Sequence, residues 1–514
     1  MRFAWVVLGG ACAILSGCFD PDPGGAETDD ASDTSAGESA TPGGTTLGDT
    51  PTDETSSPPA ATEGGTGDTG TTDPDTTEGP SGCAGEGLDP SCDEATPYCQ
   101  DGTCVDCTGL PADACIGFDS ATPVCDADAG VCAGCTEHDQ CVTGACRFST
   151  GECFAESNRL WVDNTFAGCA AGVGSEESPM CTVEQAVQVI NAQIGMDPWA
   201  VFVAGSPNPY VGTIDPSNNR PIAVVGPSSG LSAILVGDGN WTIDLWNQSP
   251  ETYLANLTIE GASDGQAGSA SIRCNTGVAY LTDSNLVNSI VGVNINGCSL
   301  HMRRSLVSTG GWGVQQSGGE LFADETVFEN SSGAIESGGS VTLRRSYVRD
   351  HWVDGGIHIT DGGDLTLVNS MVYNNNYVNR GIMASGGTVD IVGSTVIGNF
   401  DCLDTAVGPH SVRSSIVMNH FDVGGMACAN ATVDDSLVND GVALGAGNVP
   451  VEAADMGSIF VDPNQGMGSD WHVLPGSLPE GVAVHLEGDP RVDIDGDPRP
   501  QRPGAADYAG ADVP

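Results

Sequence analysis

The sequence predicts an all-β protein whose larger part is a right-handed parallel β-helix of about 10–12 coils. Three observations lead to this fold class. Apolar and polar residues alternate in short runs, similar phrases return every 20 to 25 residues, and each phrase is bounded by Gly, Asn or Asp. Such a period is typical of a solenoid, because one coil cannot bury its apolar face alone whereas stacked coils can.

The first twenty residues, MRFAWVVLGGACAILSGCFD, resemble a bacterial lipoprotein signal peptide that ends in a lipobox at residues 1–18. An ordinary secretory signal or a transmembrane helix fits less well, because the apolar run is short and small residues precede Cys18. The resemblance implies cleavage before Cys18 and lipidation of this cysteine, and Phe19 in place of Asp implies the outer membrane. We therefore expect a lipid-anchored protein that faces the cell exterior and contacts the membrane through its lipid.

Residues 19–82 consist almost entirely of Asp, Glu, Thr, Ser, Gly and Pro and contain no Lys or Arg. Because this composition cannot bury enough apolar surface to offset the entropy of ordering, it predicts a disordered acidic linker. The whole chain has a net charge of -54, which excludes nucleic acid as a partner. Acidic polysaccharides are also expected to be repelled, unless a metal ion bridges the charges.

Residues 83–155 contain twelve cysteines in a repeated order, as the phrases TPYCQDGTCVDC and TPVCDADAGVCAGC show. The CxxC pairs Cys104/Cys107 and Cys132/Cys135 have the spacing of a zinc ribbon. Export favours disulfides instead, since thiols oxidise outside the cytoplasm. The prediction is a small disulfide-rich module, whose connectivity the spacing leaves open. The pattern resembles short cysteine-rich repeats of Gram-negative surface lipoproteins, a resemblance that implies no activity.

Residues 158–514 form the predicted β-helix. Aligned on a serine two residues before an apolar position, the repeats give Ser284, Ser305, Ser346, Ser370, Ser394, Ser415 and Ser436, with Glu325 in the gap. The preceding column reads Asp283, Arg304, Asp324, Arg345 and Asn369. Opposite charges on successive coils predict a ladder of surface ion pairs, which would occupy most of the nearby arginines.

Two further phrases support the β-helix. LWVDNTFAGCAAGVGSEESPMCTVEQAVQVINA, from Leu160, is similar to the opening of pectin-lyase-like proteins, and IFVDPNQGMGSDWHVLPGSLP, from Ile459, resembles the closing segment of bacterial surface members of that group. The resemblance implies a helix that caps the first coil and is specific for fold rather than activity. Three disulfides are expected, because each cysteine pair closes the opening loop or spans about one coil: Cys169–Cys181, Cys274–Cys298 and Cys402–Cys428.

The best region for catalysis is YVRDHWVDGGIHITDGGD, residues 347–364. Paired carboxylates are the usual machinery of glycoside hydrolysis. The candidate catalytic residues are Asp350, His351, Asp354, His358 and Arg380. Against catalysis, His358 is expected to face outward beside Gln315, Ile335 and Met383, a column without an acid or a base.

Two other ligand signals are present. Asp493, Asp495 and Asp497 resemble part of a Ca²⁺ loop but lack its distal Glu, so they fit a closing turn at least as well. No other cofactor is predicted. Exposed aromatic side chains favour ligand binding, and the candidates are Trp312, Tyr347, Trp352, Tyr373 and Tyr377.

These features predict a surface-displayed binding or adhesion module that recognises glycans through the outer face of the β-helix. Two alternatives stay open. One is a polysaccharide lyase or glycoside hydrolase that uses the Asp350–Asp364 region, and the other is a structural surface protein without a ligand.

Overall fold

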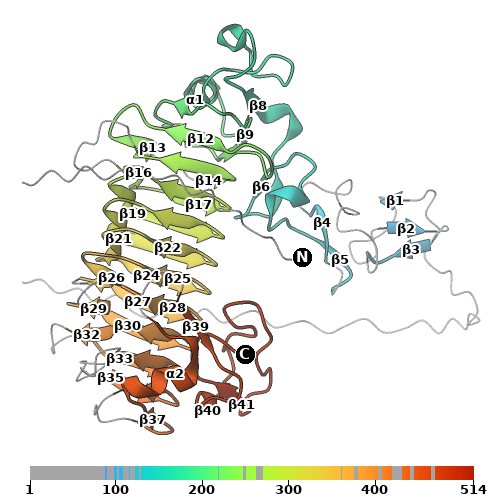
Figure 1. Cartoon of the computed structure of the whole chain (residues 1–514). Helices are drawn as coiled ribbons and strands as arrows, with labels where there is room; N and C mark the ends of the chain where they lie inside the picture. Colours follow the sequence, from blue (N-terminus) through green and yellow to red (C-terminus); the bar gives the residue numbers. More distant parts are fainter. Residues whose placement is uncertain are drawn as a thin grey trace, which may run out of the picture. The chain divides into compact units, whose positions relative to one another are not determined.

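The repeated phrases form the coils of a parallel β-helix, which winds from α1 at one end to β37 at the other (Figure 1). The computed structural model describes residues 87–88, 98–100, 103–107, 115, 122–126, 129–217, 219–246, 251–261, 270–360, 362–375, 380–402, 408–419, 431–439, 445–464 and 469–514. The predicted signal peptide and linker lie outside these residues. The predicted fold class, an all-β right-handed parallel β-helix with a capping helix, is confirmed.

Three parallel sheets form the sides of the β-helix. Sheet A consists of β8 (Arg159–Val162), β9 (Trp199–Val203), β11 (Ile222–Val225), β14 (Glu251–Ala255), β17 (Val278–Thr282), the second halves of β19 (Val291–Arg303) and β21 (Trp312–Asp324), β24 (Ser340–Arg344), β27 (Asp364–Val368), β30 (Thr388–Val392), β33 (His410–Arg413) and β35 (Ala431–Asp434). Sheet B consists of β13 (Trp241–Leu245), β16 (Ala270–Cys274), the first halves of β19 and β21, β23 (Gly333–Ser337), β26 (Gly355–Ile359), β29 (Arg380–Ala384) and β32 (Asn399–Cys402).

Sheet C contains twelve short strands. They are β10 (Tyr210–Val211), β12 (Ala233–Val236), β15 (Leu257–Glu260), β18 (Asn285–Val287), β20 (Leu306–Ser308), β22 (Val327–Glu329), β25 (Tyr347–Arg349), β28 (Met371–Tyr373), β31 (Thr395–Ile397), β34 (Ile416–Met418), β36 (Leu437–Val438) and β37 (Val449–Pro450). Inward side chains of the three sheets form one continuous core, for example Ile335, Val341 and Leu343 in sheets B and A with Val348 in sheet C.

A buried serine ladder sets the corner between sheets A and C. The residue before each serine has a positive φ, such as 44° at Arg345 and 51° at Asn369. The Ser346 N–H donates to Ser370 Oγ over 3.1 Å, and the Ser370 N–H donates to Ser394 Oγ over 3.1 Å. Each coil therefore supplies the hydrogen-bond acceptor for a buried amide of the previous coil.

The predicted ladder was wrong by one residue in one coil. Thr326, not Glu325, occupies the serine position, because its N–H donates to Ser346 Oγ. The expected charge column shifts with it, so Glu325 rather than Asp324 follows Arg304, while Asp324 lies in the neighbouring column beside Arg303. The ion pairs are nevertheless present, since Arg345 binds both acids.

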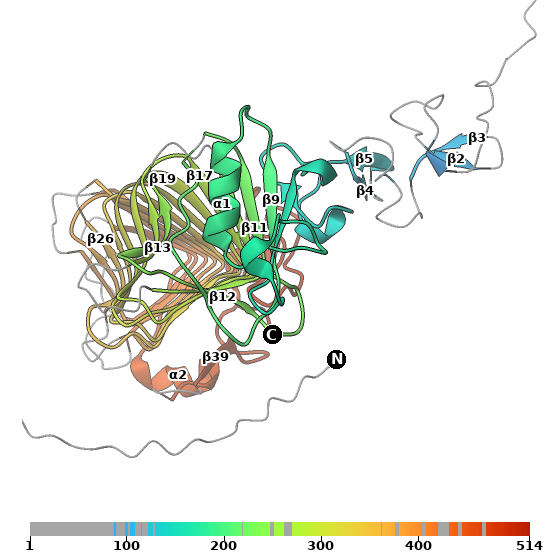
Figure 2. The ribbon, with the colours of Figure 1, turned by 90° about the horizontal axis from the view of Figure 1, so that it is seen from above.

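The first coil is capped by α1 (Val183–Ala192), which lies over it in the view from above (Figure 2). Thr182 caps the helix by accepting a hydrogen bond from the Gln185 N–H, and Val183, Ala186 and Val187 are buried against the first coil. The cysteine pairs Cys169–Cys181 and Cys274–Cys298 are joined by disulfides. Cys428, and hence the predicted Cys402–Cys428 bond, lies outside the described residues.

The cysteine-rich module contains three antiparallel pieces: β1 (Gly87–Leu88), β2 (Tyr98–Gln100) and β3 (Thr103–Val105); β4 (Val124–Asp126) and β5 (Val131–Ala133); and β6 (Cys146–Arg147) and β7 (Glu152–Cys153). Its described disulfides with both partners assigned are Cys107–Cys125, Cys115–Cys132, Cys135–Cys146 and Cys141–Cys153. The second CxxC pair is therefore oxidised to separate partners, as expected for a disulfide framework.

The last hairpin of this module packs on sheet A. Phe148 contacts Tyr253 and Tyr280 edge to face, with ring centroids 5.5 and 5.7 Å apart. Arg147 Nε lies 2.6 Å from Glu251 Oε2. Aromatic packing and a partly buried ion pair together hold the end of the module against the β-helix.

Residues 451–514, called the closing segment below, fold back along the outside of sheet C. They contain α2 (Met456–Ile459), β38 (Phe460–Asp462), β39 (Asp470–Val473), β40 (Glu480–Val484) and β41 (Ala506–Tyr508). Their apolar side chains, including Phe460 and Trp471, cover Met371 and Tyr373 of sheet C. Across the described residues, every helix is too short or too polar to traverse a bilayer.

Candidate functional site

The predicted catalytic residues are spread over different parts of the coil. Asp350 follows β25 of sheet C, whereas His358 lies on β26 of sheet B. Asp354 is exposed in the loop between them. His351 is 2% exposed, and its Nε2 lies 3.1 Å from the Phe328 carbonyl oxygen. Burial lowers the pKa of His351 to about 4, so this side chain is a neutral part of the core.

The outward column around His358 also differs from the expectation. The register places Glu336, not Ile335, beside His358, and Gln315 beside Glu336. A one-residue slip moves every side chain of a strand to the opposite face, so the acid was missed. Gln315 Nε2 donates to Glu336 Oε2 over 3.1 Å, which ties this carboxylate to the neighbouring coil. The side chain of Arg380 lies outside the described part.

The aromatic candidates do not form a common surface. Tyr373 is 6% exposed and Tyr347 is partly buried, because the closing segment covers both. The Tyr347 hydroxyl donates to Asp495 Oδ1 over 3.3 Å. Trp352 is 54% exposed on a separate loop, and Trp312 packs over Gly333. Tyr377 lies outside the described residues.

The three aspartates proposed for Ca²⁺ form a turn. Asp493 Oδ1 accepts hydrogen bonds from the N–H groups of Asp495 and Asp497 over 3.0 and 2.7 Å. Asp493 Oδ2 accepts from the Val513 N–H over 3.0 Å. Both oxygens of the buried carboxylate are thus used by the backbone, which is the behaviour of an aspartate that shapes a closing turn.

A cluster that the sequence analysis did not find lies nearby. His472 Nδ1 is 2.6 Å from Asp470 Oδ1, and His472 Nε2 is 3.0 Å from Asp495 Oδ2. Asp512 is buried beside them and accepts a hydrogen bond from the Val473 N–H. Burial raises the pKa of Asp512 to about 6. The imidazole is hydrogen-bonded to Asp470 of its own strand and lies beside the carboxylates of Asp495 and Asp512.

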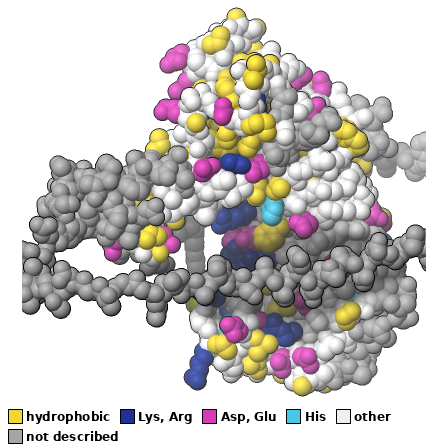
Figure 3. Space-filling model, turned by 180° about the vertical axis from the view of Figure 1, so that it is seen from behind, with side chains coloured by type: hydrophobic (Ala, Val, Ile, Leu, Met, Phe, Trp, Pro, Cys, Tyr) yellow, Lys and Arg dark blue, Asp and Glu magenta, His cyan; other side chains and the backbone are white. Residues whose placement is uncertain are grey.

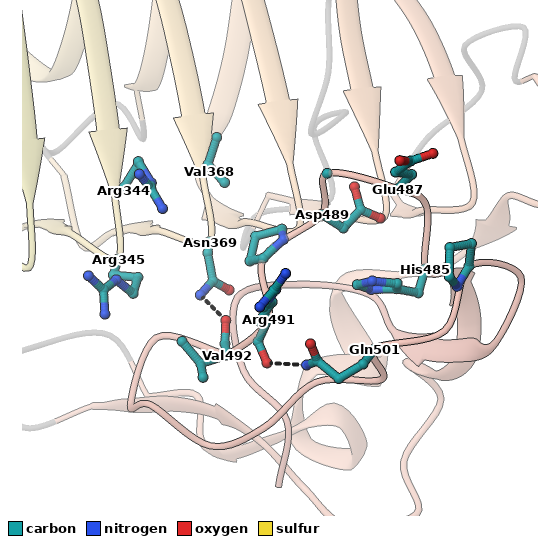
Figure 4. A pocket seen from close by; sticks show the side chains of 13 residues that line it. Arg344, Arg345, Val368, Asn369, His485, Glu487, Asp489, Arg491, Val492 and Gln501 are labelled. Carbon is teal, nitrogen blue, oxygen red and sulfur yellow. Dashed lines mark hydrogen bonds between the residues drawn. The ribbon is translucent and has the colours of Figure 1, made fainter. Parts of the chain in front are cut away.

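A groove of about 990 Å³ lies between sheet A and the closing segment and is called the closing-segment groove below. Arg344 and Arg345 lie on one side of it, and His485, Arg491 and Gln501 on the other (Figure 4). On the face shown in Figure 3, arginine side chains gather close together although the molecule as a whole is strongly acidic.

Two of the charged side chains that line the groove, Arg345 and Asp489, are already paired. Arg413 binds Asp489 through two hydrogen bonds of 3.0 and 2.7 Å. Burial raises the pKa of Asp489, but this arginine outweighs burial and holds the pKa below its usual range. Arg345 Nη2 lies 2.8 Å from Asp324 Oδ2. In the described part of the chain, Arg344 and Arg491 line the groove without an ion pair or a side-chain hydrogen bond.

His485 also lines the groove. Its side chain is 5% exposed, and its ring extends from the closing segment into the groove (Figure 4). Its Nδ1 makes no hydrogen bond in the described structure and lies 3.9 Å from Asp507 Oδ2. Nδ1 is thus directed at a buried carboxylate, while the ring itself forms part of the groove wall.

Sequence reasoning missed this site because its two sides are far apart in the chain. Asn369 Nδ2 of sheet A donates to the Val492 carbonyl oxygen over 2.8 Å, across 123 residues. No local spacing signals such a contact. The one available signal was that Arg344 borders the charge ladder, where the acid opposite it, Asp324, is bound by Arg345.

Comparisons with known proteins add a family match and two likenesses of fold. Residues 69–137 match a family described as "Family of unknown function (DUF8331)", which covers most of the cysteine-rich module and none of the β-helix. No curated protein matches the chain.

Two solved structures are similar. The pectate lyase Pel9A is 13% identical with a TM-score of 0.41, covering 70% of this chain and 96% of that one. The pectin methylesterase from Aspergillus niger is 10% identical with a TM-score of 0.30, covering 59% of this chain and 89% of that one. These identities and TM-scores describe a similar path of the backbone and nothing about function.

Proposed function

We propose that this protein is a carbohydrate-binding module, displayed at the cell surface by a lipid on Cys18 and the linker of residues 19–82. The ligand lies in the closing-segment groove. The observation that supports this proposal is the groove itself, which combines a large volume with unused donors on Arg344 and Arg491. Ligand sites are typically concave and orient their ligand with a few polar groups.

Binding is favoured over hydrolysis by the state of the carboxylates. Asp489 is held ionised by Arg413 and is therefore a poor proton donor. The other acid in the groove, Glu487, is exposed to solvent. A pair of carboxylates with separate acid and base roles, as hydrolysis requires, is not formed by these two residues.

A lyase is the second candidate, because lyases of this fold type use an arginine or lysine as base and two groove arginines have no acidic partner. The two functions differ in their products. A lyase cleaves the polymer and leaves an unsaturated sugar, whereas a binding module releases the polymer intact.

The test uses the full chain with Cys18→Ser, which keeps every folded part and removes the lipid. We expect this protein to retain a subset of glycans on an array, and neither unsaturated nor reducing ends to appear after long incubation. Arg491→Gln is expected to weaken retention. Failure to bind any glycan would overturn the proposal, and release of unsaturated products would replace it with the lyase.

A further inference from the structure

We propose that the closing-segment groove selects glycans that carry anionic groups, carboxylate or sulfate, held between Arg344 and Arg491 and hydrogen-bonded by His485. This inference rests on the proposed function and narrows it to a ligand class. It also reverses the expectation, drawn from the net charge of -54, that acidic polysaccharides are repelled. The potential within a groove depends on the groups that line it, and it can differ in sign from the molecule as a whole.

Most arginines outside the groove already have a partner in the described structure. Nine arginines form ion pairs with acids, and Arg220 donates to two backbone carbonyl groups. Among the arginine side chains that the structure describes, Arg344, Arg491 and Arg502 have neither arrangement. Two of these three face the same groove. In a chain with 69 acidic residues, two unpaired cations at one cavity indicate a partner that brings its own negative charge.

The backbone that carries Arg491 is held in place by hydrogen bonds. Its carbonyl oxygen accepts hydrogen bonds from Gln501 Nε2 over 2.8 Å and from the Arg499 N–H over 2.9 Å. Arg499 in turn is buried and donates to Asp507. The backbone at Arg491 is therefore fixed while its guanidinium stays free. An arginine held in this way loses less entropy when its planar fork binds an oxyanion.

His485 supplies a further polar group to the groove. The ring of His485 extends into the groove, where an oxygen of an anionic group can accept a hydrogen bond from it. Arginine and histidine donors converging from opposite sides of one groove match a carboxylate or sulfate, which presents several acceptor oxygens. The volume of about 990 Å³ lies near the upper end of the range for ligand pockets, so the groove has room for sugar rings as well as the charged group.

Glu487 allows a test in which stronger binding, not weaker binding, is expected. This acid lines the same groove and forms no ion pair in the described structure. Because its charge opposes an anionic ligand, Glu487→Gln is expected to strengthen binding severalfold, whereas it would weaken binding of a cationic ligand.

The experiment measures binding of dextran, dextran sulfate and carboxymethyl dextran to the full Cys18→Ser chain by calorimetry. The three polymers share one backbone, so they separate charge from sugar recognition, and the two anionic forms separate sulfate from carboxylate. We expect at least one anionic polymer to bind and dextran not to bind. Arg344→Gln and Arg491→Gln should each weaken binding about tenfold, as expected for loss of a charge-assisted hydrogen bond.

Arg502→Gln is the matched control, since Arg502 is also exposed and lies in the same segment but does not line the groove. An equal loss with this variant would show general charge attraction and overturn the inference. Equal binding of dextran would also overturn it. If instead the glycan array identifies a neutral ligand that depends on the groove, the proposed function stands and the anionic class is wrong; if no glycan of either kind binds, both fail.

Discussion

At the scale of single residues, the corner between sheets A and C explains why the sequence repeats a serine. The chain turns through a residue with positive φ, and the next amide points along the β-helix axis rather than into a sheet ladder. Serine satisfies both requirements of the site: Ser370 Oγ accepts from the Ser346 N–H and donates to the Val368 carbonyl oxygen over 2.9 Å. An apolar residue would leave two buried backbone groups with fewer partners.

Ser370→Ala is expected to destabilise the protein by about 1–3 kcal/mol, because the buried Ser346 N–H loses its acceptor. Thermal unfolding followed by circular dichroism measures the change. Ser340→Ala is the control, since Ser340 is exposed and its hydroxyl makes no hydrogen bond in the described part. Equal melting temperatures for the two variants would contradict the role of the ladder.

Asp512 makes the stability of the closing segment depend on pH. Burial raises its pKa to about 6, so the folded protein holds this proton more tightly than the unfolded chain. Burial lowers the pKa of His472, but the hydrogen bond to Asp470 and the nearby acids raise it overall. For both groups the folded state binds more protons, and stability therefore falls as the pH rises from about 4 through about 7.

Asp512→Asn is expected to raise the melting temperature at pH 8 by a few degrees and to change it little at pH 4.5. The amide oxygen can still accept from the Val473 N–H, while the buried charge is gone. Melting curves across this pH range test the prediction. A variant whose melting temperature falls equally at both pH values would show that the carboxylate is needed for another reason.

At the scale of elements, the closing segment is held to the β-helix by a few long-range contacts. Arg413 of β33 binds Asp489, which is 8% exposed, and Arg499 donates to Asn369 Oδ1 over 3.2 Å. These contacts join residues that are 76 and 130 positions apart. Together with the bond from Asn369 to Val492, they position residues 485–503 beside sheet A and so form one side of the groove.

Arg413→Gln is expected to lower stability by about 1–3 kcal/mol, because it leaves the mostly buried Asp489 carboxylate without its cation. It should also weaken glycan binding by loosening one side of the groove. Arg159→Gln serves for comparison, since its partner Glu156 is 78% exposed and such pairs contribute little. Unfolding curves in urea would show the difference, and equal losses in both variants would refute it.

Sequence alone predicted the strands better than their contacts. Alternation and the period near 21 residues identified sheets A and C, since each inward position is set by its own coil. The predicted register was wrong where the pattern allowed two choices. Thr326 rather than Glu325 occupies the serine position, and Glu336 rather than Ile335 lies beside His358. The groove could not be predicted, because it depends on how the closing segment folds back and not on any local repeat.

At the scale of the whole molecule, charge is distributed unevenly along the chain. The 69 acids include those of residues 19–82, which carry no Lys or Arg, whereas the arginines lie almost entirely in the β-helix and the closing segment. Like charges along residues 19–82 repel one another and favour an extended segment, which would hold the folded part away from a membrane surface. Cys18 is the proposed point of attachment.

Cys18→Ser is expected to move the protein from the membrane fraction to the soluble fraction, because a lipid anchor supplies the only membrane contact we propose. Cys12→Ser, which changes a cysteine in the same twenty residues but keeps Cys18, should leave the protein in the membrane fraction. Fractionation with immunoblotting distinguishes the two. An unmodified Cys18 in the protein recovered from the membrane fraction, measured by mass spectrometry, would exclude lipidation at this residue.

The folding back of residues 451–514 has a consequence for biogenesis. The coils are synthesised from the amino end, so each new coil can stack on the previous one as it leaves the ribosome. The serine hydrogen bonds fix the register between them. The outer flank of sheet C, with Met371, Tyr373 and Ile416, stays uncovered until the final stretch arrives. A chain that lacks the closing segment would expose these apolar side chains and be prone to aggregation.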